Sequence, residues 1–180
     1  MKKVLISGFT PFNKSANNYS AEVLARIESD IFMIDKVIID VVYDRSFDKL
    51  SENGLAGYDF ILSLGEARMR SVLTVESRAK NLSSCSIPDN AGIFKQNELI
   101  DPAAPEQLTS ALDLMCISDL AEISDDAGKF VCNNLYFHLL QHDPHKVLFI
   151  HVPECNNDES LYKLYADKIV MILERLLYNE

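Results

Sequence analysis

Short apolar runs alternate along this chain with longer segments whose apolar residues recur at helical spacing. A run that stays apolar over several residues is typical of a buried strand, whereas recurrence every three or four residues indicates an amphipathic helix. On this basis we predict strands over residues 3–7, 32–42, 59–65, 71–76 and 147–152. Helices are predicted over residues 20–28, 44–53, 106–115, 129–141 and 158–177, and a proline-containing loop segment over residues 85–105.

This alternation of strands and helices predicts an α/β fold. Strands that are apolar throughout are typical of a mostly parallel sheet with helices on both faces, which gives a three-layer α/β/α arrangement. No linker or internal repeat interrupts residues 1–180, so we predict a single domain. Sites in such sheets form at the carboxyl ends of strands, where Gly8, Gly65 and His151 are expected to converge.

The charge of the chain limits the classes of partner. Its formal net charge is −10, and no basic tract is present that would neutralise several phosphates. This composition argues against a nucleic-acid-binding role and against binding to anionic membranes. The first apolar run, residues 4–6, is far too short for a secretory signal, and no stretch approaches the ~20 apolar residues of a membrane span. We therefore expect a cytoplasmic protein.

Among the four cysteines, Cys132 has the most informative surroundings. It follows a small polar turn containing Gly128 and falls in the first turns of a predicted helix. Unpaired N–H groups and the partial positive charge at a helix N-terminus favour a thiolate, which is the nucleophilic form of cysteine. The alternative is that Cys132 is a small apolar residue of the core, because cysteine is among the most often buried residue types.

Two further residues suggest how such a thiol would be activated. His151 ends a predicted buried strand and could act as the general base for Cys132, although a histidine there could equally be a satisfied core residue. Glu76 ends another apolar run and could orient His151, which would complete a Cys–His–carboxylate triad. The alternative for Glu76 is a solvated residue at the edge of the sheet.

Other candidate sites are weaker. His138 and His142 lie four residues apart on one predicted helix face, but no third ligand is placed by the pattern, so we predict no metal site. Gly8 does not belong to a phosphate-binding glycine motif. Phe9 and Phe12, next to that strand end, suit a flat apolar ligand better, or else pack into the core.

Five short motifs then occur in a recognisable order. They are residues 8–12, Glu76 with Arg78-Ala79 and Asn81, residues 87–90 with Gly92, Ala127-Gly128 with Cys132-Asn133, and residues 150–153. In this order, over nearly the whole chain, they resemble pyroglutamyl peptidase type I, also called pyrrolidone-carboxylate peptidase. The resemblance implies a phosphorylase/hydrolase-like α/β/α fold and a cysteine peptidase that removes N-terminal pyroglutamate from peptides. It implies no cofactor, and it implies assembly as a homodimer or homotetramer.

The resemblance also assigns roles to individual residues. It implies that Cys132 is the nucleophile, His151 the general base and acid, and Glu76 the orienting carboxylate. Phe9 and Phe12 match the aromatic segment that sandwiches the pyrrolidone ring. The remaining residues that it brings to the substrate pocket are Asn18, Gly65 and Glu66.

The chain departs from the family pattern around this pocket. Ser86 stands where an arginine is typical, and losing a cationic donor near the oxyanion can cost a factor of ~10²–10³ in rate. Asn13-Lys14 replaces a usual glycine, residues 66–70 lack the usual glycines, and the region 99–124 is short. These departures leave open reduced activity or altered specificity, a non-catalytic binding protein on the same scaffold, or an amidase that acts on other small acyl or lactam substrates.

Overall fold

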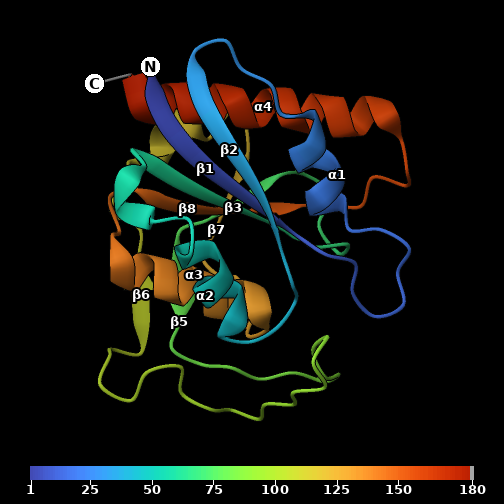
Figure 1. The fold of residues 1–180 in the computed structure, drawn as a ribbon, viewed down its shortest axis with the longest axis vertical. Helices are drawn as coiled ribbons and strands as arrows, with labels where there is room; N and C mark the ends of the chain where they lie inside the picture. The colour runs from blue at the N-terminus through green and yellow to red at the C-terminus, as the bar shows by residue number, and fades with distance from the viewer. Residues whose placement is uncertain (179–180) are drawn as a thin grey trace.

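The computed structural model describes residues 1–178 and is built around one six-stranded sheet (Figure 1). The strand order is β2-β1-β3-β8-β4-β7, and every neighbouring pair is parallel except β4 with β8. The strands are β1 (Lys2–Phe9), β2 (Phe32–Ile39), β3 (Phe60–Glu66), β4 (Thr74–Glu76), β7 (Glu122–Ser124) and β8 (Val147–Val152). The expected mostly parallel sheet is confirmed.

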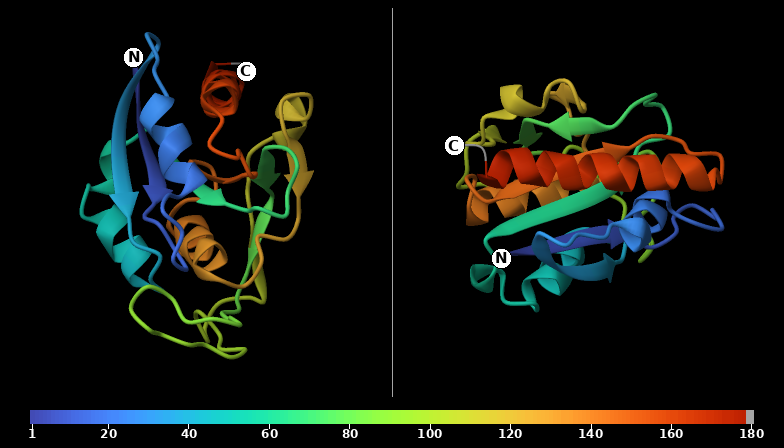
Figure 2. Two further views of the ribbon diagram at one scale, coloured as in Figure 1. Left: turned by 90° about the vertical axis from the view of Figure 1, so that its right-hand side faces the viewer. Right: turned by 90° about the horizontal axis from the view of Figure 1, so that it is seen from above.

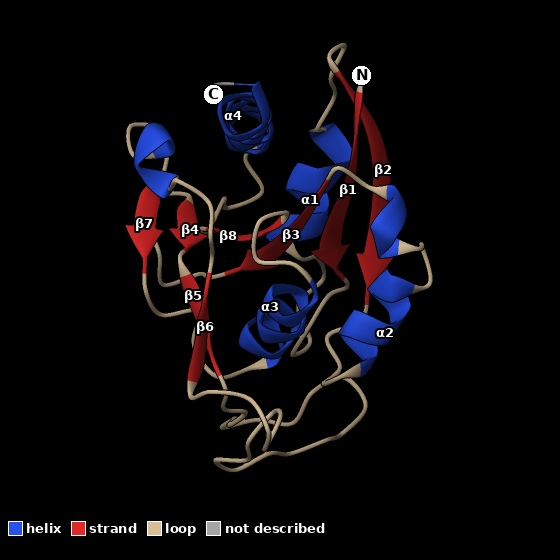
Figure 3. Cartoon of the chain, turned by 90° about the vertical axis from the view of Figure 1, so that its left-hand side faces the viewer, coloured by secondary structure: helices blue, strands red, loops and turns tan. Residues whose placement is uncertain are grey.

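Helices cover both faces of this sheet (Figures 2 and 3). One face carries α1 (Tyr19–Arg26) and α4 (Glu159–Tyr178), and the other carries α2 (Arg45–Ser51) and α3 (Val131–His142). The apolar side chains separate accordingly into two buried clusters, one on each side of the sheet. The expected three-layer α/β/α fold is therefore confirmed.

The three central strands explain why the apolar runs were a reliable signal. All side chains of β8 are buried, as are those of β3 up to Gly65. Alternate residues of one strand point to opposite faces, so Val4 joins the cluster under α1 and α4 while Leu5 joins the cluster under α3. A strand covered on both faces needs apolar residues at every position, which is the pattern seen.

Segment 106–115 differs from the prediction of a helix. It contains β6 (Gln107–Thr109), which pairs antiparallel with β5 (Arg78–Lys80), and the start of a short 3₁₀ helix, Leu114–Ile117. The Ser110 N–H also donates to the Ser77 carbonyl, which extends this pairing. Pairing with a segment about thirty residues away has therefore overridden the local helical pattern, as tertiary contacts commonly do. A second 3₁₀ helix, Leu55–Gly57, precedes β3.

Segment 85–105 contains no helix or strand and runs across the end of the molecule below α3 (Figure 1). Buried polar side chains hold it in place. Asn81 donates to the carbonyls of Asp101 and Ala104 and accepts from two backbone N–H groups of the same segment. Asp89 accepts from the N–H groups of Tyr43, Ala91 and Ile93. The motif residues Asn81 and Asp89 thus shape the loop.

In the described part of the chain, we find no helix with both the length and the apolar character required to cross a membrane.

Candidate active site

Cys132 is the second residue of α3, and its thiol lies directly over the backbone of β3. A Cβ atom added at Gly65 would lie 2.8 Å from the Cys132 Sγ and 2.8 Å from the Phe149 ring. Real Cβ atoms do not approach other heavy atoms so closely, so the absence of a side chain at Gly65 is what allows the thiol to sit there. Gly65 pairs with His151 on the neighbouring strand β8, which places the thiol and the imidazole at the same end of the sheet.

The reversed direction of β4 brings Glu76 to His151. Thr74 pairs with His151 and Glu76 with Phe149, so the side chains of Glu76 and His151 share one face of the sheet. Their Oε1 and Nδ1 atoms are 2.7 Å apart, and both side chains are buried. Because a carboxylate can only accept, the Nδ1–H donates to it and leaves Nε2 free for a proton from the thiol or the substrate.

Arg70 shares the same carboxylate oxygen. Its Nη2 lies 2.9 Å from Glu76 Oε1, and it also donates to the Ser124 hydroxyl and the Asp126 carbonyl. The second oxygen, Oε2, is buried and has no hydrogen-bond partner within residues 1–178. The imidazole and the guanidinium therefore both contact the same oxygen of Glu76. The contact of Arg70 with Glu76 was not predicted from the sequence.

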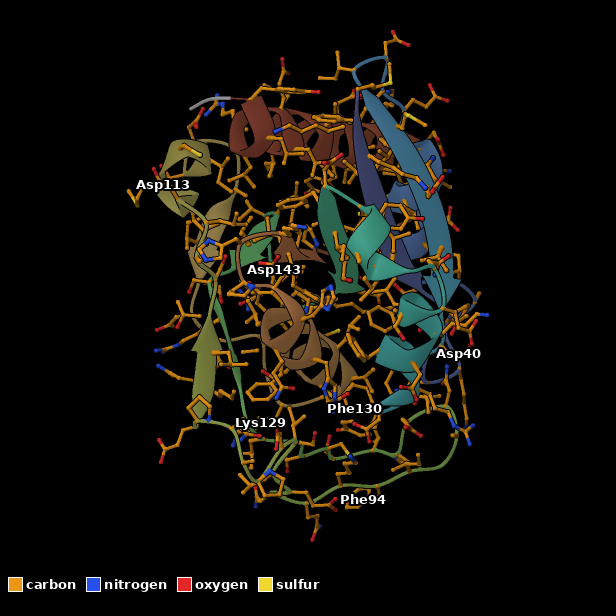
Figure 4. All side chains as sticks on the ribbon, turned by 60° about the vertical axis from the view of Figure 1, so that its left-hand side comes forward. Asp40, Phe94, Asp113, Lys129, Phe130 and Asp143 are labelled. Atoms are coloured by element: carbon orange, nitrogen blue, oxygen red, sulfur yellow. The ribbon has the colours of Figure 1, made fainter. Side chains whose placement is uncertain are left out.

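The predicted substrate residues gather around the thiol. One cavity of about 70 Å³ is lined by Phe9, Phe12, Asn18, Val41, Glu66, Phe130 and Cys132. The rings of Phe12 and Phe130 are in contact, with centroids 5.0 Å apart. Figure 4 shows Phe130 at the end of α3 that faces segment 85–105. The cavity is small and largely aromatic, so it suits a flat group of few atoms.

Two residues that line the cavity, Phe130 and Val41, were not predicted from the sequence. Phe130 is the N-cap residue of α3, two positions before Cys132, and Val41 follows the carboxyl end of β2. Both positions carried a usable signal, because residues at strand ends and at the start of the nucleophile helix meet at this edge of the sheet. Gly65 lies beneath the thiol, where its role is to leave room.

Asn18 lines the cavity, but its amide is already bonded to the protein. Its Oδ1 accepts from the Ser20 N–H and hydroxyl, which caps α1, and its Nδ2 donates to the Thr10 carbonyl. An N-cap bond of this kind typically contributes about 1 kcal/mol to helix stability. The contacts of Asn18 therefore fix the loop that carries Phe12.

The protonation state of Cys132 differs from the expectation. We expected the helix N-terminus to favour the thiolate, but burial, followed by the nearby charges of Glu76 and Glu66, raises the pKa of the Cys132 thiol to about 12. Its own backbone N–H opposes this shift only in part. The resting group is therefore a neutral thiol, which must lose its proton to a base during attack.

We expect the alkylation rate of Cys132 by iodoacetamide to keep rising with pH well into the alkaline range. Because the pKa is raised, the thiolate fraction increases about tenfold per pH unit below that pKa. Mass spectrometry of the modified peptide would follow the reaction, with free cysteine as the control, since its rate levels off above about pH 8.5. An alkylation rate for Cys132 that is already constant near neutral pH would show that the helix N-terminus lowers the pKa of the thiol by more than burial raises it.

The histidines considered for metal binding lie away from this site. His138 Nε2 is 3.5 Å from Asp44 Oδ1, and His142 is exposed near the end of α3. Among residues 1–178, no group of three or more potential ligand side chains is close enough to hold a metal ion.

Ser86 is exposed on segment 85–105, at the border of a second cavity of about 310 Å³. This cavity shares Phe12 and Phe130 with the aromatic cavity and is also lined by Ser84, Cys85, Ile87 and Lys129. The position where the family pattern has arginine therefore lies beside the aromatic pair and carries only a small hydroxyl.

A sequence profile described as pyroglutamyl peptidase matches residues 2–164. The chain belongs to the pyroglutamyl peptidase family. The pyrrolidone-carboxylate peptidase of Bacillus subtilis is 32% identical over 191 residues, covering 96% of this chain and 89% of the relative. That of Vibrio parahaemolyticus is 30% identical over 167 residues, covering 85% and 79%.

Solved structures of the same family share the fold. Pyroglutamyl peptidase I of Bacillus amyloliquefaciens is 29% identical, with a TM-score of 0.84 and 94% coverage of both chains. A variant of pyrrolidone carboxyl peptidase from the hyperthermophile Pyrococcus furiosus is 25% identical, with a TM-score of 0.88 and coverage of 98% of this chain and 99% of that one. The resemblance identified from the five motifs is therefore confirmed.

Proposed function

We propose that this protein removes N-terminal pyroglutamate from peptides, with Cys132, His151 and Glu76 as its catalytic triad. The observation that carries the proposal is the buried His151–Glu76 pair, with its 2.7 Å separation, on the strand next to the glycine that seats the Cys132 thiol. Family membership supports the same reaction. No step requires a cofactor.

The aromatic cavity supplies a place for the acyl group. Phe9 and the Phe12–Phe130 pair present flat apolar surfaces that suit a five-membered lactam, which is neutral and has polar edges. With the ring held there, the carbonyl carbon of pyroglutamate lies next to Cys132, which also lines the cavity. The leaving peptide then extends out of the cavity.

The reaction follows from these positions. His151 takes the thiol proton as the Cys132 sulfur bonds to the carbonyl carbon, and Glu76 stabilises the imidazolium that forms. The carbon–nitrogen bond then breaks, and His151 gives the proton to the leaving amine. Water, deprotonated by His151, hydrolyses the thioester, which releases pyroglutamate and restores the thiol.

The start of α3 provides donors for the oxyanion. The first hydrogen bond within this helix is donated by the Asn134 N–H to the Phe130 carbonyl, and no side chain caps the Phe130 position. The N–H groups of Cys132 and Asn133 consequently have no acceptor inside the helix. These N–H groups can stabilise the tetrahedral intermediate even though Ser86 stands in the place of a cationic arginine. We therefore infer that turnover is slower but not abolished.

Hydrolysis of pyroglutamyl-7-amido-4-methylcoumarin under reducing conditions tests the proposal. We expect turnover of this amide and none of the acetyl-alanyl amide, because an open acyl group lacks the flat ring that fills the aromatic cavity. A folded protein that binds pyroglutamyl amides without cleaving them would favour the non-catalytic alternative. Cleavage of both amides would favour a broader amidase.

Assembly as a homodimer or homotetramer is also part of the proposal and rests on the family resemblance.

A further inference from the structure

One wall of the aromatic cavity carries a charged side chain. Glu66 is the last residue of β3, immediately after the glycine under the thiol, and its side chain is 15% exposed. It lines the cavity together with Phe9, Phe12 and Cys132. A carboxylate so placed is close to any ring that occupies the cavity, and it offers only hydrogen-bond acceptors.

The protein holds this carboxylate at both oxygens. Oε2 accepts from the Tyr19 N–H at 2.8 Å, and Oε1 accepts from Arg68 Nε at 2.6 Å. Each oxygen has a second lone pair, so the group can still accept a hydrogen bond from a ligand. Its position is thus fixed before a substrate arrives.

Arg68 is itself held in place beside Glu66. Its guanidinium lies over the Tyr19 ring, 5.0 Å from the centroid, and Nη2 donates to the Ser15 hydroxyl at 3.1 Å. The side chain is 42% exposed, so it approaches Glu66 from the solvent side. The residue therefore neutralises the Glu66 charge while tying the loop that carries Phe12 to the end of β3.

We propose that Glu66 accepts a hydrogen bond from the ring nitrogen of the substrate, and that Arg68 sets how much negative charge Glu66 presents to it. This proposal deepens the function proposed above. The two five-membered rings found at peptide N-termini differ at this nitrogen. Pyroglutamate has a neutral lactam N–H, whereas N-terminal proline has a cationic secondary ammonium. The Glu66–Arg68 pair would then decide between a neutral and a cationic ring, and N-terminal proline becomes a second substrate class.

The test is the ratio of kcat/KM for prolyl- and pyroglutamyl-7-amido-4-methylcoumarin in the wild type and in variants. Arg68→Gln removes the positive charge that neutralises the Glu66 carboxylate. The prolyl-to-pyroglutamyl ratio should therefore rise at least about tenfold, as expected for one unbalanced negative charge near a cationic ring in a partly buried site. Glu66→Gln leaves Arg68 unbalanced, so the ratio should fall by a similar factor. Arg68→Lys keeps the charge and should keep the ratio near the wild-type value, which a purely structural role of the guanidinium would not do.

A binding measurement keeps the test independent of turnover. Pyroglutamic acid amide and prolinamide would each be titrated for protection of Cys132 against iodoacetamide, and the ratio of their dissociation constants should move in the same directions. The proposal is overturned if the kcat/KM ratio and the ratio of dissociation constants in both Gln variants stay within about twofold of the wild-type ratios. If the wild type cleaves neither amide, the proposed peptidase function fails, while the binding ratios still decide on the role of the Glu66–Arg68 pair.

Discussion

Replacing Cys132 with alanine should lower kcat/KM for a pyroglutamyl amide by about 10⁴-fold or more, because nothing else at the site can form the acyl-enzyme. Among the described residues that line the aromatic cavity, Cys132 carries the only thiol and none carries a hydroxyl, and the thiol stands over Gly65 beside the strand of His151. Alanine is a good helix former and smaller than cysteine, so α3 should begin at the same residue. Initial rates with the fluorogenic amide measure the effect.

Cys116→Ala is the matched control for this change. Cys116 is also half-buried, but it lies in the 3₁₀ helix Leu114–Ile117, where its Sγ contacts the Asp113 carbonyl. The same loss of a thiol there should leave kcat/KM within about twofold of the wild type, since the residue touches no part of the site. Activity of Cys132→Ala above about one per cent of the wild-type value would instead assign the nucleophile to another residue.

How well the fold could be predicted depended on burial. Strands β1, β3 and β8 are covered on both faces, so their sequences are apolar at nearly every position and were identified. Strands β5, β6 and β7 are three residues each, are partly exposed and were not predicted as such. A three-residue strand has too few positions to show a periodicity, and its existence depends on a partner far away in the sequence.

The residues of the proposed triad could be named from the sequence because they sit in motifs, but the electrostatics around them could not be predicted. The predicted position of Cys132 at the start of a helix was correct. The expectation that its thiolate is favoured was wrong, because burial and two carboxylates from the strands beneath α3 raise the pKa of the thiol. The Arg70 contact with Glu76 and the Arg68 contact with Glu66 likewise join side chains whose geometry no spacing reveals. Such contacts depend on where the fold places side chains, and local pattern carries no information on that.

The sharing of one oxygen by His151 and Arg70 gives the second prediction, which concerns Glu76→Gln. The amide oxygen can take the place of Oε1 and accept from both donors, while the NH₂ takes the place of Oε2, which has no partner within residues 1–178. The imidazole would then keep its tautomer and its hydrogen bond, and it would lose the neighbouring negative charge. We expect kcat to fall about 10³-fold, because a buried imidazolium loses about 4 kcal/mol of stabilisation without the carboxylate.

Glu122→Gln provides the matched control for the charge. Glu122 lies on β7 opposite Thr74, two residues along β4 from Glu76, but it is exposed and belongs to no part of the site. Its kcat should stay within about twofold of the wild type, so a loss confined to Glu76→Gln separates the loss of the triad charge from a general loss of negative charge. If Glu76→Gln kept more than about a tenth of the wild-type kcat, stabilisation of the imidazolium would not limit the reaction, and Glu76 would act mainly by orienting His151.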